Sequence, residues 1–251
     1  MKLIQSRDNA YYKQLKRLAE SGRERRKRGR TLLDGLHLAQ AWEAQRGPLS
    51  ELVVAESALG GGEVADWLAG RDCTVIGDAL MRELGIVDTP SGLLAVVDTP
   101  QPAAAADPDG DAVLLDGVQD PGNLGSLLRS AAAAGVGQVL LAPGCAAAWS
   151  PKVLRAGQGA HFVLSIHEDR DLADFMTAYR GTTLATTLER ATSLYAASWA
   201  GPLAWVFGAE GRGVSPALIE RAGLRIHIPM PGAVEDRKST RLNSSHRIRS
   251  R

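Results

Sequence analysis

Residues 116–135 read DGVQDPGNLGSLLRSAAAAG, and this stretch is the most informative part of the chain. A short apolar run at 112–115 precedes it and predicts a buried strand. Asp120-Pro121-Gly122 is a sequence typical of tight turns, and Asn123 has the residue type and the position expected of a helix N-cap. The small and apolar residues that follow predict a helix over 123–134. The stretch is therefore predicted to form a strand, a tight turn and a helix.

Arg129 is the one charged residue in this predicted helix. It lies six residues after Asn123, so more than half a turn separates the two side chains, and it could simply face solvent. The small residues at 130–134 favour close helix packing, however, and a cation beside them calls for a reason. Both interpretations stay open on these residues alone.

The alternation of short strands and helices continues along the chain to residue 228. Strands are predicted at 112–115, 138–142, 162–166, 182–187, 203–207 and 225–228, and helices at 123–134, 151–157, 170–179 and 215–221. This alternation indicates an α/β fold with a mostly parallel sheet that helices cover on both faces. Such sheets bind ligands at the carboxyl ends of their strands.

Two more segments stand out because each follows a predicted strand. Residues 206–216 read VFGAEGRGVSP, and residues 226–235 read IHIPMPGAVE. Glycine-rich turns let the backbone approach a ligand closely, and Glu210 among three glycines is hard to explain as part of a plain turn. The dinucleotide pattern G-x-G-x-x-G is absent, and so is the phosphate loop G-x-x-x-x-G-K-[ST]. A nucleotide-binding enzyme of those types is therefore disfavoured.

A linker separates this region from a smaller N-terminal unit. Residues 99–111 hold two prolines before an alanine run and a third after it, with no large apolar side chain. Before the linker, strands are predicted at 31–33, 52–54, 74–76 and 93–97, with helices at 35–45, 63–69 and 78–84. We expect residues 31–98 to form a small α/β domain and residues 112–235 to form the larger one.

The first 30 residues are strongly basic. They carry 11 Lys and Arg against 3 Asp and Glu, whereas residues 31–235 carry 12 against 24. The pattern predicts one cationic helix from Asp8 to Arg30. The run at 25–28, which is Arg25, Arg26, Lys27 and Arg28, is either a solvated helix face or a set of contacts to RNA phosphates.

Taken together, the segments at 116–135, 206–216 and 226–235 resemble, in order and spacing, the three motifs of the SpoU-type RNA ribose 2′-O-methyltransferases, which belong to the SPOUT superfamily. The likeness extends from residue 1 to Glu235. It implies a parallel sheet with a deep trefoil knot, S-adenosylmethionine as methyl donor, structured ribosomal or transfer RNA as substrate, and a homodimer that builds each site from both subunits. The small domain at 31–98 would then bind the RNA substrate.

The resemblance also implies roles for single residues. Arg129 would act on the ribose 2′-hydroxyl, with Asn123 and Glu210 organising the site. The backbone at Gly208 and Ile228, with Met230 nearby, would hold the cofactor. A guanidinium has an ordinary pKa above about 12, so Arg129 suits stabilisation of a developing alkoxide better than proton removal.

The resemblance ends after Glu235. Residues 236–251 read DRKSTRLNSSHRIRSR, with Leu242 and Ile248 as the only large apolar residues. The family continues here with a long apolar helix that completes the knot and much of the dimer interface, and this segment cannot form it. We interpret residues 236–251 as translated read-through foreign to the protein, with a basic RNA-binding tail as the alternative. This interpretation predicts an incomplete knot, a weaker dimer and impaired catalysis.

Composition excludes several other classes of protein. No apolar run reaches the length of about 20 residues that a membrane span needs, and the N-terminus lacks a signal-peptide core, so we expect a cytoplasmic protein. The two cysteines and five histidines show no metal-ligand spacing, and we expect no metal. The main alternative to an enzyme is an RNA-binding protein without catalysis, or an impaired truncated copy of the methyltransferase.

Overall fold

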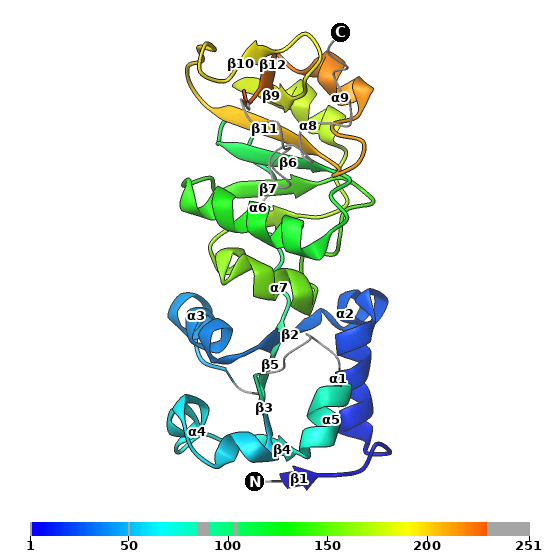
Figure 1. The fold of residues 1–251 in the computed structure, drawn as a ribbon, viewed down its shortest axis with the longest axis vertical. Coiled ribbons are helices and arrows are strands. Elements are labelled where there is room, and N and C mark those ends of the chain that lie inside the picture. The colour runs from blue at the N-terminus through cyan, green and yellow to red at the C-terminus, as the bar shows by residue number, and fades with distance from the viewer. Residues whose placement is uncertain (1, 50, 85–90, 103–104, 230–251) are drawn as a thin grey trace, which may run out of the picture. The chain divides into compact units, whose positions relative to one another are not determined.

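The computed structural model describes residues 2–49, 51–84, 91–102 and 105–229, which fold into two compact units (Figure 1). Unit 1 comprises Met1–Gln101 together with Trp149–Val163, and unit 2 comprises the rest of the chain. Met230 and the segment 236–251 lie outside the described residues. The expected trefoil knot depends on residues beyond Glu235 and stays a prediction.

Unit 1 is built on a five-stranded mixed sheet. Its strands are β1 (Lys2–Ile4), β2 (Arg30–Asp34), β3 (Leu52–Ala55), β4 (Thr74–Ile76) and β5 (Leu93–Asp98), in the order β1-β4-β3-β5-β2. β5 runs antiparallel to both β2 and β3, and the other pairs are parallel. The four strands predicted between residues 31 and 97 are confirmed, whereas β1 was not predicted.

Helices cover both faces of this sheet. α1 (Ala10–Glu20) and α5 (Asp78–Glu83) lie on one face, and α3 (Leu36–Arg46) and α4 (Glu63–Leu68) lie on the other (Figure 1). A short 3-10 turn, η1 (Glu56–Leu59), follows β3. The buried side chains of α1 and α5 pack on apolar residues of the sheet, including Leu32, Val53 and Leu94. Burial of this apolar surface is the main stabilising contribution to the unit.

The N-terminal basic segment is not the single helix that was predicted. It divides into α1 and α2 (Gly22–Arg28), and Ser21 between them is extended, with φ −115° and ψ 110°. The Ser21 hydroxyl accepts a hydrogen bond from the backbone N–H of Glu24, which caps α2. Ser21 and Glu24 have the S-x-x-E spacing of a capping box, and this local signal outweighs the continuous charge pattern.

Residues 149–163 fold with unit 1 although they lie among unit 2 residues in the sequence. They contain α7 (Pro151–Gly157) and a 3-10 turn, η2 (Ala160–Phe162). The Thr31 hydroxyl on β2 donates to the Trp149 carbonyl at 2.7 Å, and Arg155 of α7 forms an ion pair with the fully buried Asp34 carboxylate. Nothing in the local sequence of 149–163 indicated these long-range contacts.

Unit 2 contains a seven-stranded sheet in which every pair is parallel. Its strands are β6 (Ala112–Asp116), β7 (Gln138–Leu141), β8 (Ser165–His167), β9 (Thr182–Thr186), β10 (Thr192–Ser193), β11 (Leu203–Gly208) and β12 (Leu224–His227). The order is β10-β12-β9-β11-β6-β7-β8. The α/β class and the parallel sheet are confirmed. The strand predicted at 162–166 lies at 165–167, because 160–162 forms η2, and β10 was not predicted.

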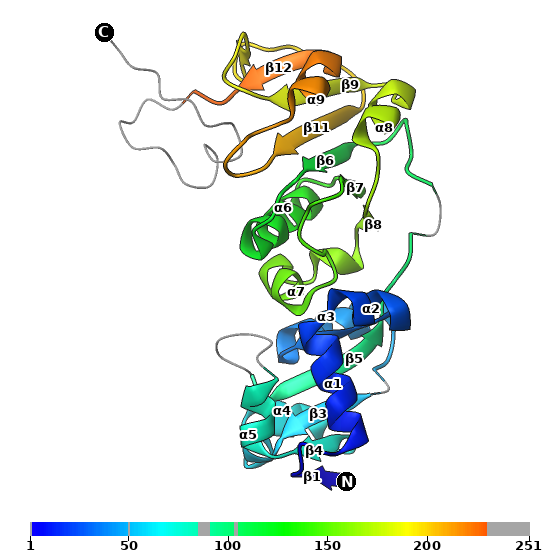
Figure 2. The same cartoon turned by 90° about the vertical axis from the view of Figure 1, so that its right-hand side faces the viewer.

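The helices of unit 2 are α6 (Pro121–Ala133), α8 (Leu172–Ala178) and α9 (Pro216–Arg221). α8 and α9 pack on the sheet face that carries Leu114, Ala204 and Val206. The chain leaves β6 toward β7 and β8, and it later places β11 and β9 on the other side of β6 (Figure 2). The carboxyl ends of β6 and β11 therefore flank a topological switch point, where parallel sheets bind ligands. No helix within the described residues is long and apolar enough to cross a membrane.

Candidate functional site

Two loops meet at the switch point. One follows β6 and spans 117–120, and the other follows β11 and spans 209–215. Asp116 ends β6, and its Oδ2 accepts a hydrogen bond from the backbone N–H of Ser215 at 2.7 Å. This contact joins residues that are 99 positions apart in the chain. The first two sequence motifs are therefore tied together at the carboxyl ends of neighbouring strands.

The N-cap of α6 differs from the prediction. Asp120, not Asn123, occupies the cap, and its Oδ1 accepts a hydrogen bond from the Asn123 backbone N–H at 2.8 Å. Pro121 then stands at the first helical position, which suits its fixed φ. The correction has a functional consequence, because the Asn123 side chain is free to make a tertiary contact.

That contact is with Glu210. The Asn123 Nδ2 donates to Glu210 Oε1 at 3.0 Å, and the backbone N–H groups of Gln119 and Asp120 donate to the same carboxylate at 3.4 and 3.3 Å. The Glu210 carboxylate thus accepts two backbone N–H groups from the turn before α6 and one side-chain N–H from the first turn of α6. Carboxylates at a helix N-terminus are further stabilised by the helix dipole. The structure brings Asn123 and Glu210 together, and Glu210 organises the turn that carries Asn123.

Gly208 lies where only glycine fits. A Cβ on Gly208 would come within 1.9 Å of the Gly213 carbonyl carbon and 2.0 Å of the Val214 nitrogen. Ala209 and Gly213 close the turn with two backbone hydrogen bonds of 3.1 and 2.8 Å, and Gly213 has φ +69°. The glycines of this motif therefore allow the loop to fold back tightly on the end of β11.

Ile228 directly follows β12, which is two strands away from β11 at the same edge of the sheet. Strand spacing of about 4.8 Å separates the ends of β11 and β12 by about 10 Å. Gly208 is the last residue of β11 and pairs with Asp116 of β6, whereas Ile228 is the first residue beyond β12. Met230, the third residue assigned to the cofactor, lies outside the described residues.

Arg129 is not beside Asn123 and Glu210. Six helical residues advance the chain by one full turn and about 240° more, so the Arg129 side chain lies about 120° from that of Asn123 by the shorter way round and about 9 Å along α6. The side chain is exposed, and it forms no hydrogen bond or ion pair within the part of the chain that the structure describes. The site in one chain therefore contains the organising pair without this cation.

Cys145 lies next to the same loops but does not offer a nucleophile. Its Sγ donates to the Leu115 carbonyl at 3.3 Å, and burial raises the pKa of the thiol. A thiol with a raised pKa stays protonated near neutral pH and attacks poorly. Cys145 therefore has a structural place beside these loops.

The basic segment of α2 contains two kinds of residue. The Arg25 side chain is buried, and its Nη1 donates to the carbonyls of Leu18 and Ala19 at 2.7 and 3.0 Å, which caps the C-terminus of α1. Arg26, Lys27 and Arg28 are exposed, and Arg28 forms an ion pair with Glu24. The geometry thus gives Arg25 a structural role and leaves the other three facing solvent.

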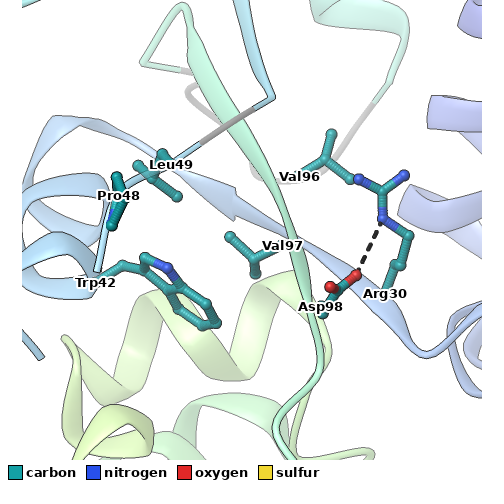
Figure 3. Close-up of a pocket in the computed structure, with 7 residues that line it drawn as sticks. All are labelled: Arg30, Trp42, Pro48, Leu49, Val96, Val97 and Asp98. Carbon is teal, nitrogen blue, oxygen red and sulfur yellow. Dashed lines mark ion pairs between the residues drawn. The ribbon is translucent and has the colours of Figure 1, made fainter. Parts of the chain in front are cut away.

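A separate pocket lies in unit 1 and is lined by Arg30, Trp42, Pro48, Leu49, Val96, Val97 and Asp98 (Figure 3). Arg30 forms ion pairs with Asp98, at 3.5 Å, and with Glu51. The Tyr11 hydroxyl donates to Glu51, and burial raises the pKa of Tyr11, so this hydroxyl stays protonated. Two carboxylates neutralise the one guanidinium, and the pocket is therefore a poor site for a phosphate.

Comparison with known proteins agrees with this geometry. Residues 111–236 match the family model described as the SpoU rRNA Methylase family. The chain is 30% identical over 238 residues to the 23S rRNA (guanosine(2553)-2′-O)-methyltransferase RlmP of Bacillus subtilis, covering 94% of this chain and 93% of the relative. An uncharacterized tRNA/rRNA methyltransferase of Synechocystis is 29% identical, with 92% and 87% covered.

Solved structures resemble most of the chain as well. A crystal structure of an RNA 2′-O ribose methyltransferase superposes with a TM-score of 0.77 at 29% identity, covering 95% of this chain and 93% of the other. The SpoU methyltransferase AviRb from Streptomyces viridochromogenes, solved in complex with AdoMet, gives a TM-score of 0.77 at 23% identity, with 93% and 94% covered. The second likeness concerns the fold alone.

Proposed function

The chain belongs to the SpoU rRNA methylase family, and on that premise we propose that it transfers a methyl group from S-adenosylmethionine to a ribose 2′-hydroxyl of RNA. The observation that carries the proposal is the contact between Asn123 and Glu210. It unites two motifs at the carboxyl ends of β6 and β11, where a parallel sheet binds its ligands. Ribosomal RNA is the first substrate class to test, because the Bacillus subtilis relative is named for 23S rRNA.

The strand ends fit the methyl donor. Gly208, at the end of β11, and Ile228, just beyond β12, would hold it through backbone groups at this edge of the sheet. Backbone N–H and C=O groups suit the hydrogen-bonding edge of an adenine ring. When bound, S-adenosylmethionine supplies an electrophilic methyl group on its sulfonium.

The chain's own residues must make the ribose hydroxyl reactive. A hydroxyl is a poor nucleophile, so the site has to align it and stabilise the alkoxide charge that develops. Arg129 suits the second task, because a guanidinium remains charged at neutral pH. Glu210 already accepts three N–H groups, so it acts as a positioning residue and not as the base. The proton leaves to water or to a substrate phosphate.

The position of Arg129 supports a site shared between two copies of the chain. Its exposed guanidinium is turned away from Asn123 and Glu210 of its own chain, and it is available to reach a second subunit. A homodimer in which the Arg129 of one subunit meets the Asn123 and Glu210 pair of the other would complete the constellation. Closed twofold symmetry would then produce two equivalent sites.

Unit 1 would bind the RNA through its basic surface. Arg26, Lys27 and Arg28 are exposed on α2 and supply the phosphate contacts, whereas Arg25 stabilises the junction of α1 and α2. Phosphate contacts of this kind give affinity without sequence specificity. The identity of the modified nucleotide would come from other contacts.

The test is methyl transfer to RNA by the purified protein. Fragments of 23S rRNA are incubated with S-adenosylmethionine that carries a tritiated methyl group, and digested product is analysed by mass spectrometry. We expect a nucleoside that is heavier by one methyl and has an unshifted base fragment. A methylated base would overturn the assignment. Absent transfer, with RNA bound but no heat of S-adenosylmethionine binding, would instead indicate a non-catalytic RNA-binding protein or the impaired copy of the enzyme that residues 236–251 predict.

A further inference from the structure

Arg212 is a cation at the switch point that the three motifs did not assign to any role. It lies in the loop between β11 and α9, between Gly211 and Gly213. A Cβ built on Gly117 would lie 3.7 Å from Arg212 Nη2, so the guanidinium rests against the turn that follows β6. Its charge is therefore held where the two loops of the candidate site meet.

The loop presents Arg212 on a closed turn. Ala209 and Gly213 exchange two backbone hydrogen bonds on either side of it, and the end of β11 packs on Gly213 and Val214 without room for a Cβ on Gly208. Gly117 has φ +71°, a backbone conformation that favours glycine, and this turn is in van der Waals reach of the guanidinium. The position of the Arg212 backbone is thus set by the same glycines that shape the cofactor edge.

The carboxylates of the two loops do not neutralise this cation. Asp116, Asp120 and Glu210 each accept backbone N–H groups, from Ser215, from Asn123, and from the turn at 119–120. Arg212 is exposed and forms no ion pair or hydrogen bond within the described ranges. The guanidinium lies on the same two loops as these three carboxylates without pairing with any of them, so it is available to an external anion.

We propose that Arg212 binds a phosphate of the RNA substrate beside the ribose that is methylated. The proposal rests on the proposed function, because it requires RNA at the carboxyl ends of β6 and β11. Guanidinium presents a planar set of donors that matches phosphate oxygens, and every ribose in RNA has a phosphate next to it. Residues 31–235 carry a net charge of −12, so RNA needs a local cation to approach this site.

The two arginines of the site then have separate tasks. Arg129 acts on the hydroxyl during the reaction, and Arg212 holds the flanking phosphate before and during it. An interaction that is equally strong in the ground state and the transition state changes KM for RNA without changing kcat. This difference allows the role of Arg212 to be measured.

The experiment compares Arg212→Ala, Arg212→Lys and Arg212→Glu with Arg221→Ala, a matched control in which an exposed arginine at the end of α9 is removed. We expect KM for RNA to rise about tenfold in Arg212→Ala and further in Arg212→Glu, with kcat within about threefold. Lysine should recover part of the loss, and Arg221→Ala should match the unmodified protein. The affinity for S-adenosylmethionine, measured by calorimetry, should stay unchanged.

RNA binding is also measured without turnover, by fluorescence anisotropy over a series of salt concentrations. The logarithm of the RNA association constant falls linearly with the logarithm of the salt concentration. Removal of one phosphate interaction should reduce the steepness of that line by about 0.7 to 0.9. An unchanged slope and RNA affinity in Arg212→Ala would overturn the proposal, and so would a loss confined to S-adenosylmethionine affinity. Because this assay needs no methyl transfer, it tests Arg212 even if the proposed activity fails.

Discussion

The side-chain amide of Asn123 donates to the Glu210 carboxylate at 3.0 Å across 87 positions of the sequence. Glu210 also accepts the backbone N–H groups of Gln119 and Asp120, so one carboxylate holds the whole turn that begins α6. Each half of this contact comes from a different motif. A substitution at either residue therefore tests whether the two loops are held together.

Replacing Glu210 with glutamine should disrupt that assembly. One oxygen becomes an NH₂ donor that faces N–H groups, and the remaining hydrogen bonds lose the negative charge. We expect unfolding free energy to fall by about 1 to 3 kcal/mol, in line with the removal of charge-assisted hydrogen bonds. Methyl transfer should fall by about 10²-fold or more. Glu220→Gln, which changes an exposed carboxylate of α9, is the control, and equal losses in both variants would contradict the role of Glu210.

Arg129→Ala should abolish methyl transfer, with a loss of about 10² to 10³-fold, while the affinity for S-adenosylmethionine stays within about twofold. If the site is shared between subunits, mixing Arg129→Ala with Glu210→Gln should restore activity. In a random mixture, half of the dimers contain one subunit of each variant, and each of these mixed dimers has one intact site of two. We therefore expect about a quarter of the unmodified activity. Mixtures that remain as inactive as the separate variants would place Arg129 and Glu210 in the same subunit's site.

Gly208→Ala should destabilise unit 2, because its Cβ would lie 1.9 Å from the Gly213 carbonyl carbon. Overpacking of this kind costs about 1 to 3 kcal/mol or more, measured by denaturant unfolding. Gly211→Ala in the same loop is a matched control, since a Cβ there meets nothing within 4 Å. Similar stability in the two variants would show that the end of β11 tolerates a wider turn.

Substitutions of the basic residues of α2 should affect either RNA binding or stability, depending on the residue. Neutralising Arg26 and Lys27 with glutamine should weaken RNA binding and reduce the salt slope by about 0.7 to 0.9 for each phosphate interaction that the substitutions remove. Arg25→Met should instead lower the melting temperature, because the carbonyls of Leu18 and Ala19 lose their donor. A large drop in salt slope for Arg25→Met at unchanged stability would assign Arg25 to the RNA.

Arg155→Ala should destabilise unit 1, since it leaves the buried Asp34 carboxylate without its ion-pair partner. Breaking a fully buried pair costs about 3 to 5 kcal/mol, but the Arg155 side chain is 39% exposed and Ser91 also donates to Asp34, so we expect a loss of about 1 to 3 kcal/mol. Lys152→Ala on the same helix is the control. Equal stability of the two variants would mean that residues 149–163 are held to unit 1 by their apolar contacts alone.

Much of the architecture was readable from local sequence. The apolar runs at 112–115 and 203–207 are short, uninterrupted and followed by glycine-rich turns. Such runs are typical of strands that are buried on both faces. These signals are local, because strand length, turn residues and spacing act within a few positions of the chain. The grouping of Asn123, Arg129 and Glu210 in one site, by contrast, was implied by the resemblance to the SpoU motifs.

Other features were decided only by tertiary structure. Asp120 took the N-cap position predicted for Asn123, because Glu210 accepts the Asn123 side chain and the neighbouring N–H groups from 87 to 91 positions away. Residues 149–163 joined unit 1 through Asp34 and Thr31, which local patterns cannot reveal. Arg25 and Arg26 are adjacent and chemically identical, yet one is buried and the other exposed. Periodicity and spacing indicate which elements form, whereas the partner of each polar group depends on which distant segments the packed sheet brings within hydrogen-bonding reach.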